Sequence, residues 1–192
     1  MRIGLFFGSF NPVHIGHLAI ANYMAEYTDL DEVWLVVSPQ NPFKPENALA
    51  PSHQRLSLVQ RALRDSPGIK ASDIELELPS PSFTINTLRV LQERYPDDRF
   101  IIVMGSDGIS TFGDWKESDY IATNFQRLIY PRPGIVLNEK DLRNARLVRA
   151  PLIEISSTFI RESILKGKDV RHFVPAHLWE EIRSIYQEPN YA

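Results

Sequence analysis

Continuous runs of apolar residues, each stopped by a polar turn, recur along the chain. Runs without alternation are typical of strands buried on both faces, as in a parallel sheet. They predict strands at residues 3–7, 33–37, 100–104, 128–130 and 152–155. Residues 74–78 alternate between apolar and acidic positions instead, which predicts a half-buried strand suited to a sheet edge, with Glu75 and Glu77 on its solvated face.

Stretches with helical periodicity lie between these strands. They predict helices at residues 15–27, 52–64, 84–95, 158–166 and 175–186. Ser52 is suited to cap the second helix and Pro175 to begin the last. Because strands and helices alternate, we expect a single Rossmann-like α/β domain over residues 1–192, with a mostly parallel twisted sheet flanked by helices. Ligands of such folds bind at the carboxyl ends of the strands, here the loops after Phe7, Val37, Met104 and Ile155.

Composition narrows the class of protein. The formal net charge of -3 gives no global basic field, so we expect no nucleic-acid partner and a local site for any anionic ligand. The chain has no cysteine, which excludes disulfides, thiolate metal sites and a cysteine nucleophile. No apolar run approaches the roughly 18 residues of a membrane span, and the N-terminal run is too short for a signal peptide. We therefore expect a cytoplasmic enzyme or binding protein with no membrane partner.

The loop after the first predicted strand carries phosphate-binding chemistry. Residues 8–17 read GSFNPVHIGH. Gly8 and Ser9 let the backbone turn close to a ligand and offer amide donors. His14 and His17 lie on neighbouring parts of one face where the next helix begins, and that helix start adds N–H groups and a positive dipole end. Together these features predict a triphosphate cradle, whereas a zinc site lacks a clear third ligand.

Two separated motifs resemble a known superfamily. Residues 8–17 are similar to the H-x-G-H signature of nucleotidylyltransferases, and residues 155–161 (ISSTFIR) resemble its second element. Class I aminoacyl-tRNA synthetases share H-x-G-H, but this chain leaves no room for an anticodon-binding part and has no K-M-S-K-S-like string. The strings at residues 39–44, 82–88, 105–107 and 132–134, with Trp115, resemble bacterial nicotinate-nucleotide adenylyltransferases most closely. This resemblance spans nearly the whole chain.

The resemblance implies adenylyl transfer from ATP to nicotinate mononucleotide in NAD biosynthesis, giving nicotinate adenine dinucleotide and pyrophosphate. His17 would contact the α-phosphate, His14 the β- and γ-phosphates and Arg161 the departing pyrophosphate, so these three are the catalytic candidates. The full ATP site would comprise Gly8, Ser9, Phe10, His14, His17, Gly105, Asp107, Ser156, Ser157 and Arg161. The acceptor would be held by Lys44, Thr84, Thr87 and Trp115. Mg²⁺ would arrive with ATP and keep mostly water ligands, since no carboxylate cluster marks a metal site in the protein.

Several of these residues also have an ordinary structural interpretation. Ser156 or Ser157 is suited to cap the helix that follows, and Asp107 could cap another. Trp115 could stack on a pyridine ring or pack in the core. Arg161 could be a surface charge.

The chain departs from the family pattern at a few positions. Phe43 stands where histidine is usual, and Phe83 where tyrosine is usual. Ser9 and Asn11 replace the commoner threonine and aspartate. Phe43 affects one acceptor-phosphate contact, because phenylalanine cannot donate to phosphate, but it leaves the reaction class unchanged.

The chemistry needs no general base, because a phosphate monoester has a second pKa near 6 and is already ionised at neutral pH. Two alternatives stay open within the superfamily, a nicotinamide-nucleotide and a pantetheine-phosphate adenylyltransferase. A third is a nucleotide-binding regulatory module without catalysis, against which the retention of His14, His17, Lys44 and Arg161 argues. The sequence leaves the oligomeric state open, a homo-oligomer included.

Overall fold

A parallel sheet forms the centre of the molecule. The computed structural model describes residues 1–40, 49–135, 142–188 and 191. Its sheet has six strands in the order β3-β2-β1-β4-β5-β6, and every neighbouring pair is parallel. The strands are β1 (Arg2–Gly8), β2 (Glu32–Val37), β3 (Ile69–Ser72), β4 (Arg99–Gly105), β5 (Arg127–Tyr130) and β6 (Ala145–Leu147). The strand order reverses between β1 and β4, which is the switch point where folds of this kind bind ligands.

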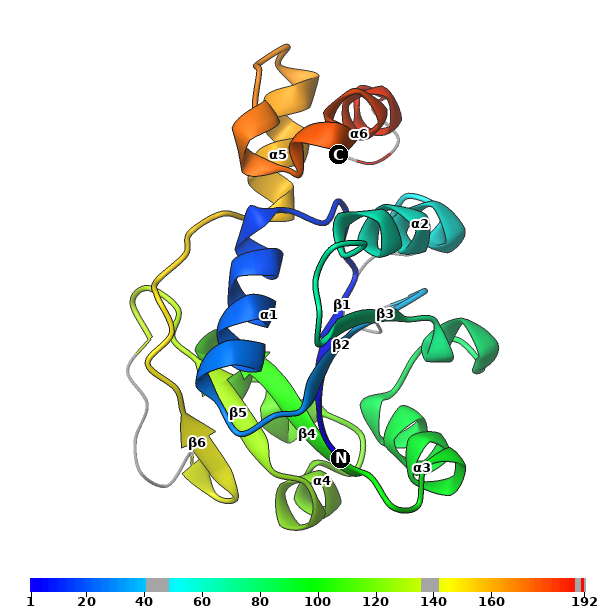
Figure 1. Cartoon of the computed structure of the whole chain (residues 1–192), viewed down its shortest axis with the longest axis vertical. Helices are drawn as coiled ribbons and strands as arrows, with labels where there is room; N and C mark the ends of the chain where they lie inside the picture. The colour runs from blue at the N-terminus through cyan, green and yellow to red at the C-terminus, as the bar shows by residue number, and fades with distance from the viewer. Residues whose placement is uncertain (41–48, 136–141, 189–190, 192) are drawn as a thin grey trace.

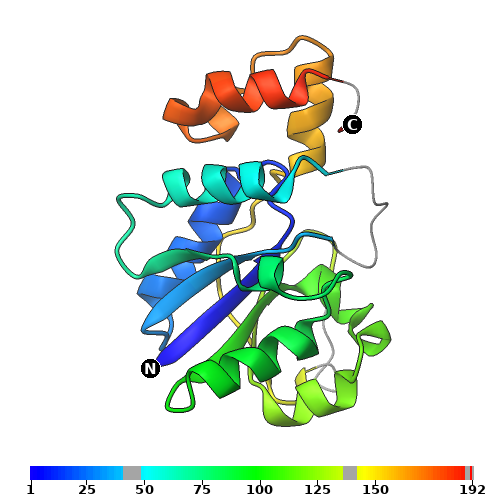
Figure 2. The same ribbon diagram turned by 90° about the vertical axis from the view of Figure 1, so that its right-hand side faces the viewer.

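Helices cover both faces of the sheet (Figures 1 and 2). Helices α1 (Ile15–Tyr27) and α2 (Ser52–Ala62) bury Met24 and Leu58 in one core cluster. Helices α3 (Thr84–Arg94) and α4 (Ser118–Asn124) bury Leu88 and Ile121 in the cluster on the opposite face. The last two helices, α5 (Ser157–Leu165) and α6 (Trp179–Tyr186), join the first cluster and lie together at one end of the molecule (Figure 1). The Rossmann-like α/β class predicted from the sequence is confirmed.

Two of the predicted strands are wrong. Residues 74–77 form a short 3₁₀ helix, η2 (Ile74–Glu77), and the strand beside β2 is formed by Ile69–Ser72 just before it. Residues 152–155 pair with no strand among the described residues, and the edge strand is β6 instead. Ile153 and Ile155 pack against the core, so the apolar pattern there reports side-chain packing rather than strand pairing.

One predicted helix cap and one predicted helix start are also wrong. Pro51, not Ser52, occupies the N-cap position of α2, and no side chain caps that helix. Pro175 precedes a 3₁₀ turn, η7 (Ala176–Leu178), and α6 begins only at Trp179. Elsewhere the predicted helices and buried strands are confirmed to within a few residues of their ends. No helix in the described part of the chain is long and apolar enough to cross a membrane.

Candidate active site

The loop between β1 and α1 lies at the switch point and presents two stacked imidazoles. The ring centroids of His14 and His17 are 3.6 Å apart, with 24° between the ring planes. His14 is the N-cap of α1, where its Nδ1 accepts a hydrogen bond from the backbone N–H of His17 at 3.3 Å. The Nδ1 of His17 accepts from the backbone N–H of His14, also at 3.3 Å. Because each Nδ1 accepts, the ring proton lies on Nε2, and each ring turns a donor away from the backbone.

Close packing fixes the histidine pair. The ring of Phe10 contacts that of His17 edge-on at 4.9 Å, and its side chain is buried in the core, so Phe10 can offer a ligand only its backbone. A Cβ on Gly16 would come within 3.0 Å of the His14 ring, so a larger residue there would displace that ring. His14 is 3% exposed, and burial, together with the positive charge of Arg132, lowers the pKa of His14 to about 3. His14 is therefore neutral at physiological pH.

The second sequence motif closes on the first. Ser157 Oγ donates to the backbone carbonyl of Pro12 at 2.9 Å, and Arg161 Nη1 donates to that of Asn11 at 2.9 Å. Ser156 caps α5 by accepting from the N–H of Phe159 at 3.1 Å, which confirms a cap at this position. The start of α5 thus meets the loop before α1, with its hydroxyls and N–H groups beside the histidine pair. Arg161 is half-buried, and burial lowers the pKa of its guanidinium, so it is not a detached surface charge.

A buried arginine holds this loop to the next one along the sheet. Arg55 of α2 is 1% exposed and donates four hydrogen bonds to backbone carbonyls. Its partners are the carbonyls of Ala50 (2.7 Å), Ser9 (2.5 Å), Ser38 (2.8 Å) and Pro39 (3.0 Å). Sequence reasoning missed Arg55. The available signal was its spacing, since Arg55 lies three and four residues before Leu58 and Val59 on the buried face of the helix.

The side chain of Asn11 ties the same loop to the last helix. Its Oδ1 accepts hydrogen bonds from the hydroxyl of Tyr186 at 2.8 Å and from the backbone N–H of Ala50 at 3.0 Å. Burial raises the pKa of Tyr186 above its ordinary value, so the phenol stays protonated and donates. Residues from α2, α5 and α6 therefore converge on the loop after β1.

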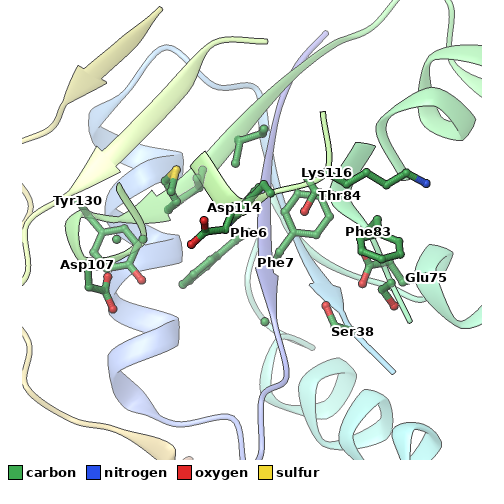
Figure 3. Close-up of a pocket in the computed structure, with 18 residues that line it drawn as sticks. Phe6, Phe7, Ser38, Glu75, Phe83, Thr84, Asp107, Asp114, Lys116 and Tyr130 are labelled. Atoms are coloured by element: carbon green, nitrogen blue, oxygen red, sulfur yellow. The ribbon is translucent and has the colours of Figure 1, made fainter. Parts of the chain in front are cut away.

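A cavity of about 320 Å³ opens beside the loop, between the carboxyl ends of β1, β2 and β4. Asp107 and Tyr130 lie at one end, and Ser38, Glu75 and Phe83 lie at the other (Figure 3). Among the predicted site residues, the cavity is lined by Gly8, Thr84, Gly105, Asp107 and Trp115. Trp115 is half-buried and its ring lies 5.4 Å from that of Phe112, so packing and an exposed ring face coexist.

One predicted site residue and one alternative structural interpretation differ from expectation. Thr87 is fully buried and donates from Oγ1 to Glu75 Oε1 at 2.8 Å, so in this structure it lies behind the cavity wall and offers no surface to an acceptor. Asp107 does not cap a helix, because Gly105 is the N-cap of the turn η3 (Ser106–Ile109). The exposed Asp107 carboxylate lies 3.7 Å from Arg132 Nε.

Lys44 and Phe43 lie outside the described residues. Glu75 is a further surprise, since it is buried against the cavity rather than solvated. In the described ranges, no three His, Cys, Asp or Glu side chains are grouped so as to hold a metal ion. A metal here would therefore be held mainly by a nucleotide's phosphates and by water.

A parallel sheet of this order, with the H-x-G-H loop held against the serine-rich start of α5, defines a nucleotidyltransferase. The family model described as cytidylyltransferase-like matches residues 5–163. A relative from Bacteroides thetaiotaomicron, named "Probable nicotinate-nucleotide adenylyltransferase", is 48% identical over 98% of this chain and 94% of its own. A relative of the same name from Cytophaga hutchinsonii is 45% identical over 100% of both chains. The chain belongs to the nicotinate-nucleotide adenylyltransferase family within the cytidylyltransferase-like proteins.

Solved structures agree on the fold. A Plasmodium falciparum nicotinic acid mononucleotide adenylyltransferase complexed with NaAD matches with a TM-score of 0.82, at 20% identity and over 97% of each chain. The same protein complexed with APC matches with a TM-score of 0.80. At this level of identity the likeness establishes the architecture, and the site must be argued from this chain's own residues.

Proposed function

We propose that this protein transfers the adenylyl group of ATP to nicotinate mononucleotide in the cytoplasm, as a step of NAD biosynthesis. The observation that carries the proposal is the tethered histidine pair, held by Ser157 and Arg161 beside a cavity that ends in an aromatic and hydroxyl-lined pocket. The side with the histidine pair suits a triphosphate, and the aromatic and hydroxyl-lined side suits a small planar ring. The names of relatives that are 45–48% identical over nearly the whole chain support the same acceptor.

The reaction forms one bond and breaks one. An ionised oxygen of the acceptor's phosphate attacks the α-phosphorus of ATP, and the bond from that phosphorus to the bridging oxygen of the β-phosphate breaks. The electron pair leaves on pyrophosphate, so no proton has to be removed at the start. The protein's task is to align the two phosphates and to stabilise the charge that builds up in the transition state.

His17 and His14 supply N–H donors at fixed positions. Both imidazoles have Nδ1 engaged with the backbone, so Nε2–H is directed to the phosphates, with His17 at the α-phosphate and His14 at the β- and γ-phosphates. The N–H groups at the start of α5, with Ser156 and Arg161, receive the departing pyrophosphate. Magnesium bound to the phosphates supplies further charge neutralisation when ATP is present.

The acceptor lies on the other side of the switch point. Thr84 begins α3, whose first N–H groups and positive dipole end favour an anionic ring substituent. Trp115 offers a ring face for stacking, and Lys44 binds the acceptor's phosphate. The adenosine of ATP lies against Gly105 and Asp107, where a Cβ on Gly105 would come 2.2 Å from Asp107 Oδ1 and close the approach.

One assay tests this function against its alternatives. The protein is incubated with ATP, Mg²⁺ and, separately, nicotinate mononucleotide, nicotinamide mononucleotide or 4′-phosphopantetheine, and pyrophosphate release is measured. We expect the highest kcat/KM with nicotinate mononucleotide. A carboxamide leaves its NH₂ facing donors, a mismatch that costs about 1–3 kcal/mol. Comparable efficiency with nicotinamide mononucleotide would indicate dual specificity, and no pyrophosphate with any acceptor would indicate a regulatory module.

A further inference from the structure

A carboxyl group is buried behind the acceptor end of the cavity. Glu75 is 1% exposed, and its Oε1 accepts from Thr87 Oγ1 at 2.8 Å. Its Oε2 is also buried but has no hydrogen-bond partner among the residues that the structure describes. Ser82 is 9% exposed, and its Oγ is in the same situation. Both residues line the cavity, and Figure 3 shows Phe83 beside Glu75. Two polar atoms at a wall that a ligand would cover thus lack a well-formed hydrogen bond among the described residues, although the hydroxyls of Ser38 and Ser82 lie close enough to act on the carboxyl group.

Within the described ranges, no charged group is among those that act on this carboxyl group. Burial raises the pKa of Glu75, and the hydroxyls of Ser38, Thr87 and Ser82 offset this only in part. The titratable groups on the same cavity are Asp107, Asp114, Lys116 and Tyr130, and none of them is among the causes of the shift.

Two cations of the neighbouring elements, Lys116 and Arg94, contact other groups. The ammonium of Lys116 lies 5.0 Å from the ring centroid of Phe83, and Arg94 of α3 pairs with Glu77 of Glu75's own turn. From α3 and from the end of β2, the groups that approach Glu75 are the hydroxyls of Thr87 and Ser38, which carry no charge. A proton on Oε2 is therefore the means by which this buried group avoids an uncompensated charge.

We propose that Glu75 is a specificity-determining residue, whose protonation sets the choice between a carboxylate and a carboxamide on the acceptor ring. This inference rests on the proposed function. With the proton in place, Glu75 is neutral and its Oε2–H can donate a hydrogen bond. The cavity wall then tolerates a carboxylate on the acceptor ring, and the hydroxyl of Ser82 can donate to that carboxylate. Without the proton, Glu75 is an acceptor and carries a negative charge, so the wall repels a carboxylate and suits the NH₂ of a carboxamide.

The expected effect is large enough to measure. Two like unit charges about 6–8 Å apart, at an effective dielectric constant of about 20, disfavour each other roughly 30–100-fold. The preference for nicotinate over nicotinamide mononucleotide should therefore fall by about that factor as the pH rises through the pKa of Glu75. Because that pKa is raised, the fall should occur above the usual range of a glutamate.

The experiment measures kcat/KM for nicotinate and nicotinamide mononucleotides from about pH 5 to pH 9, with ATP and Mg²⁺ saturating. The ratio of the two values is the readout, because titration of the acceptor phosphate and of ATP affects both acceptors alike. If one mononucleotide is not turned over, its inhibition constant against the other mononucleotide is measured at each pH in place of kcat/KM. Glu75→Gln keeps the shape and the bond to Thr87 but cannot ionise, so its ratio should not change with pH. Thr87→Val disturbs the same packing without removing the carboxyl, so its ratio should still fall.

The outcomes separate this inference from the proposed function. A flat ratio in the wild type, or the same slope in Glu75→Gln as in the wild type, overturns the role of Glu75 while adenylyl transfer stands. If the wild type adenylates neither mononucleotide, the proposed function fails and this inference falls with it. Should Glu75→Gln fold poorly, Glu75→Asp serves instead, because it keeps a titrating carboxyl and should move the pH at which the ratio changes.

Discussion

Removing the guanidinium of Arg55 should weaken both the fold and the binding of both substrates. In Arg55→Ala, four backbone carbonyls on two loops lose their donor. Each buried acceptor left unpaired costs about 1–3 kcal/mol. The full sum overstates the loss, since water can reach loops near the surface and since the desolvation cost of a buried cation is recovered. We expect a net loss of about 3–5 kcal/mol, at the upper end for single substitutions.

Thermal unfolding gives the first measurement. For a chain of this length, about 1 kcal/mol corresponds to roughly 2–4 °C in Tm, so Arg55→Ala should lower Tm by about 6–20 °C. Arg61→Ala is the matched control, because Arg61 lies on the same helix but is exposed and pairs only with Glu181 at the surface. The control should lose less than about 1 kcal/mol.

Kinetics give the second measurement. Ser9 lies in the loop that holds the histidine pair, and Ser38 and Pro39 begin the loop toward Lys44. Loosening both loops should raise KM for ATP and for the mononucleotide together, measured well below the lowered Tm. If Arg55→Ala loses no more stability than Arg61→Ala, or if only one KM changes, the buried guanidinium does not couple the two loops.

Three other substitutions or conditions test the site. His17→Ala should lower kcat by ~10²–10³ with ATP binding largely retained, since its donor acts mainly in the transition state; a loss below about tenfold contradicts the assignment. Lys44→Ala should raise KM for the mononucleotide by about 10–150-fold, and Phe43→His should partly restore it; an unchanged KM would mean that other groups hold the acceptor phosphate. Because the pKa of His14 is lowered to about 3, its contribution to stability is fully present above about pH 6.5 and falls by about 1.4 kcal/mol per pH unit toward pH 3, as denaturant titrations should record. His14→Asn, which keeps a capping side chain, should lose that slope, and an unchanged slope would show that other groups cause it.

The sequence predicts most of the scaffold because continuous apolar runs and the two signature motifs are local signals. Residues of both motifs, 8–17 and 155–161, were assigned to one ATP site, and the hydrogen bonds of Ser157 and Arg161 show that the two segments are in contact. The alternating pattern at residues 74–78 gave a wrong strand and a wrong solvated face. Which face a short segment buries depends on the residues that lie across the cavity. Glu75 looks solvated by its pattern, and only the packing of α3 and the end of β2 buries it.

Other residues were out of reach for a related reason. Arg55 forms no ion pair with any residue that the structure describes, and its four acceptors are backbone carbonyls that any residue would supply, so no sequence pairing marks it. Thr87 belongs to a string of residues that resembles the family, and it was therefore assigned to the acceptor site. Tertiary packing determines which face of α3 is turned toward the cavity, and Thr87 lies on the buried face. Hydrogen bonds between segments that are far apart in the chain leave no periodic pattern in the sequence from which they could be predicted.

The hydrogen bonds from α5 and α6 to the loop after β1 determine when that loop can be fixed while the chain is being synthesised. Ser157, Arg161 and Tyr186, which fix that loop, are synthesised well after residues 8–17. A nascent chain that has already paired β1 with β2 therefore carries the histidines without the groups that hold their loop. The loop that carries the histidine pair therefore gains these hydrogen bonds only when α5 and α6 have docked against it.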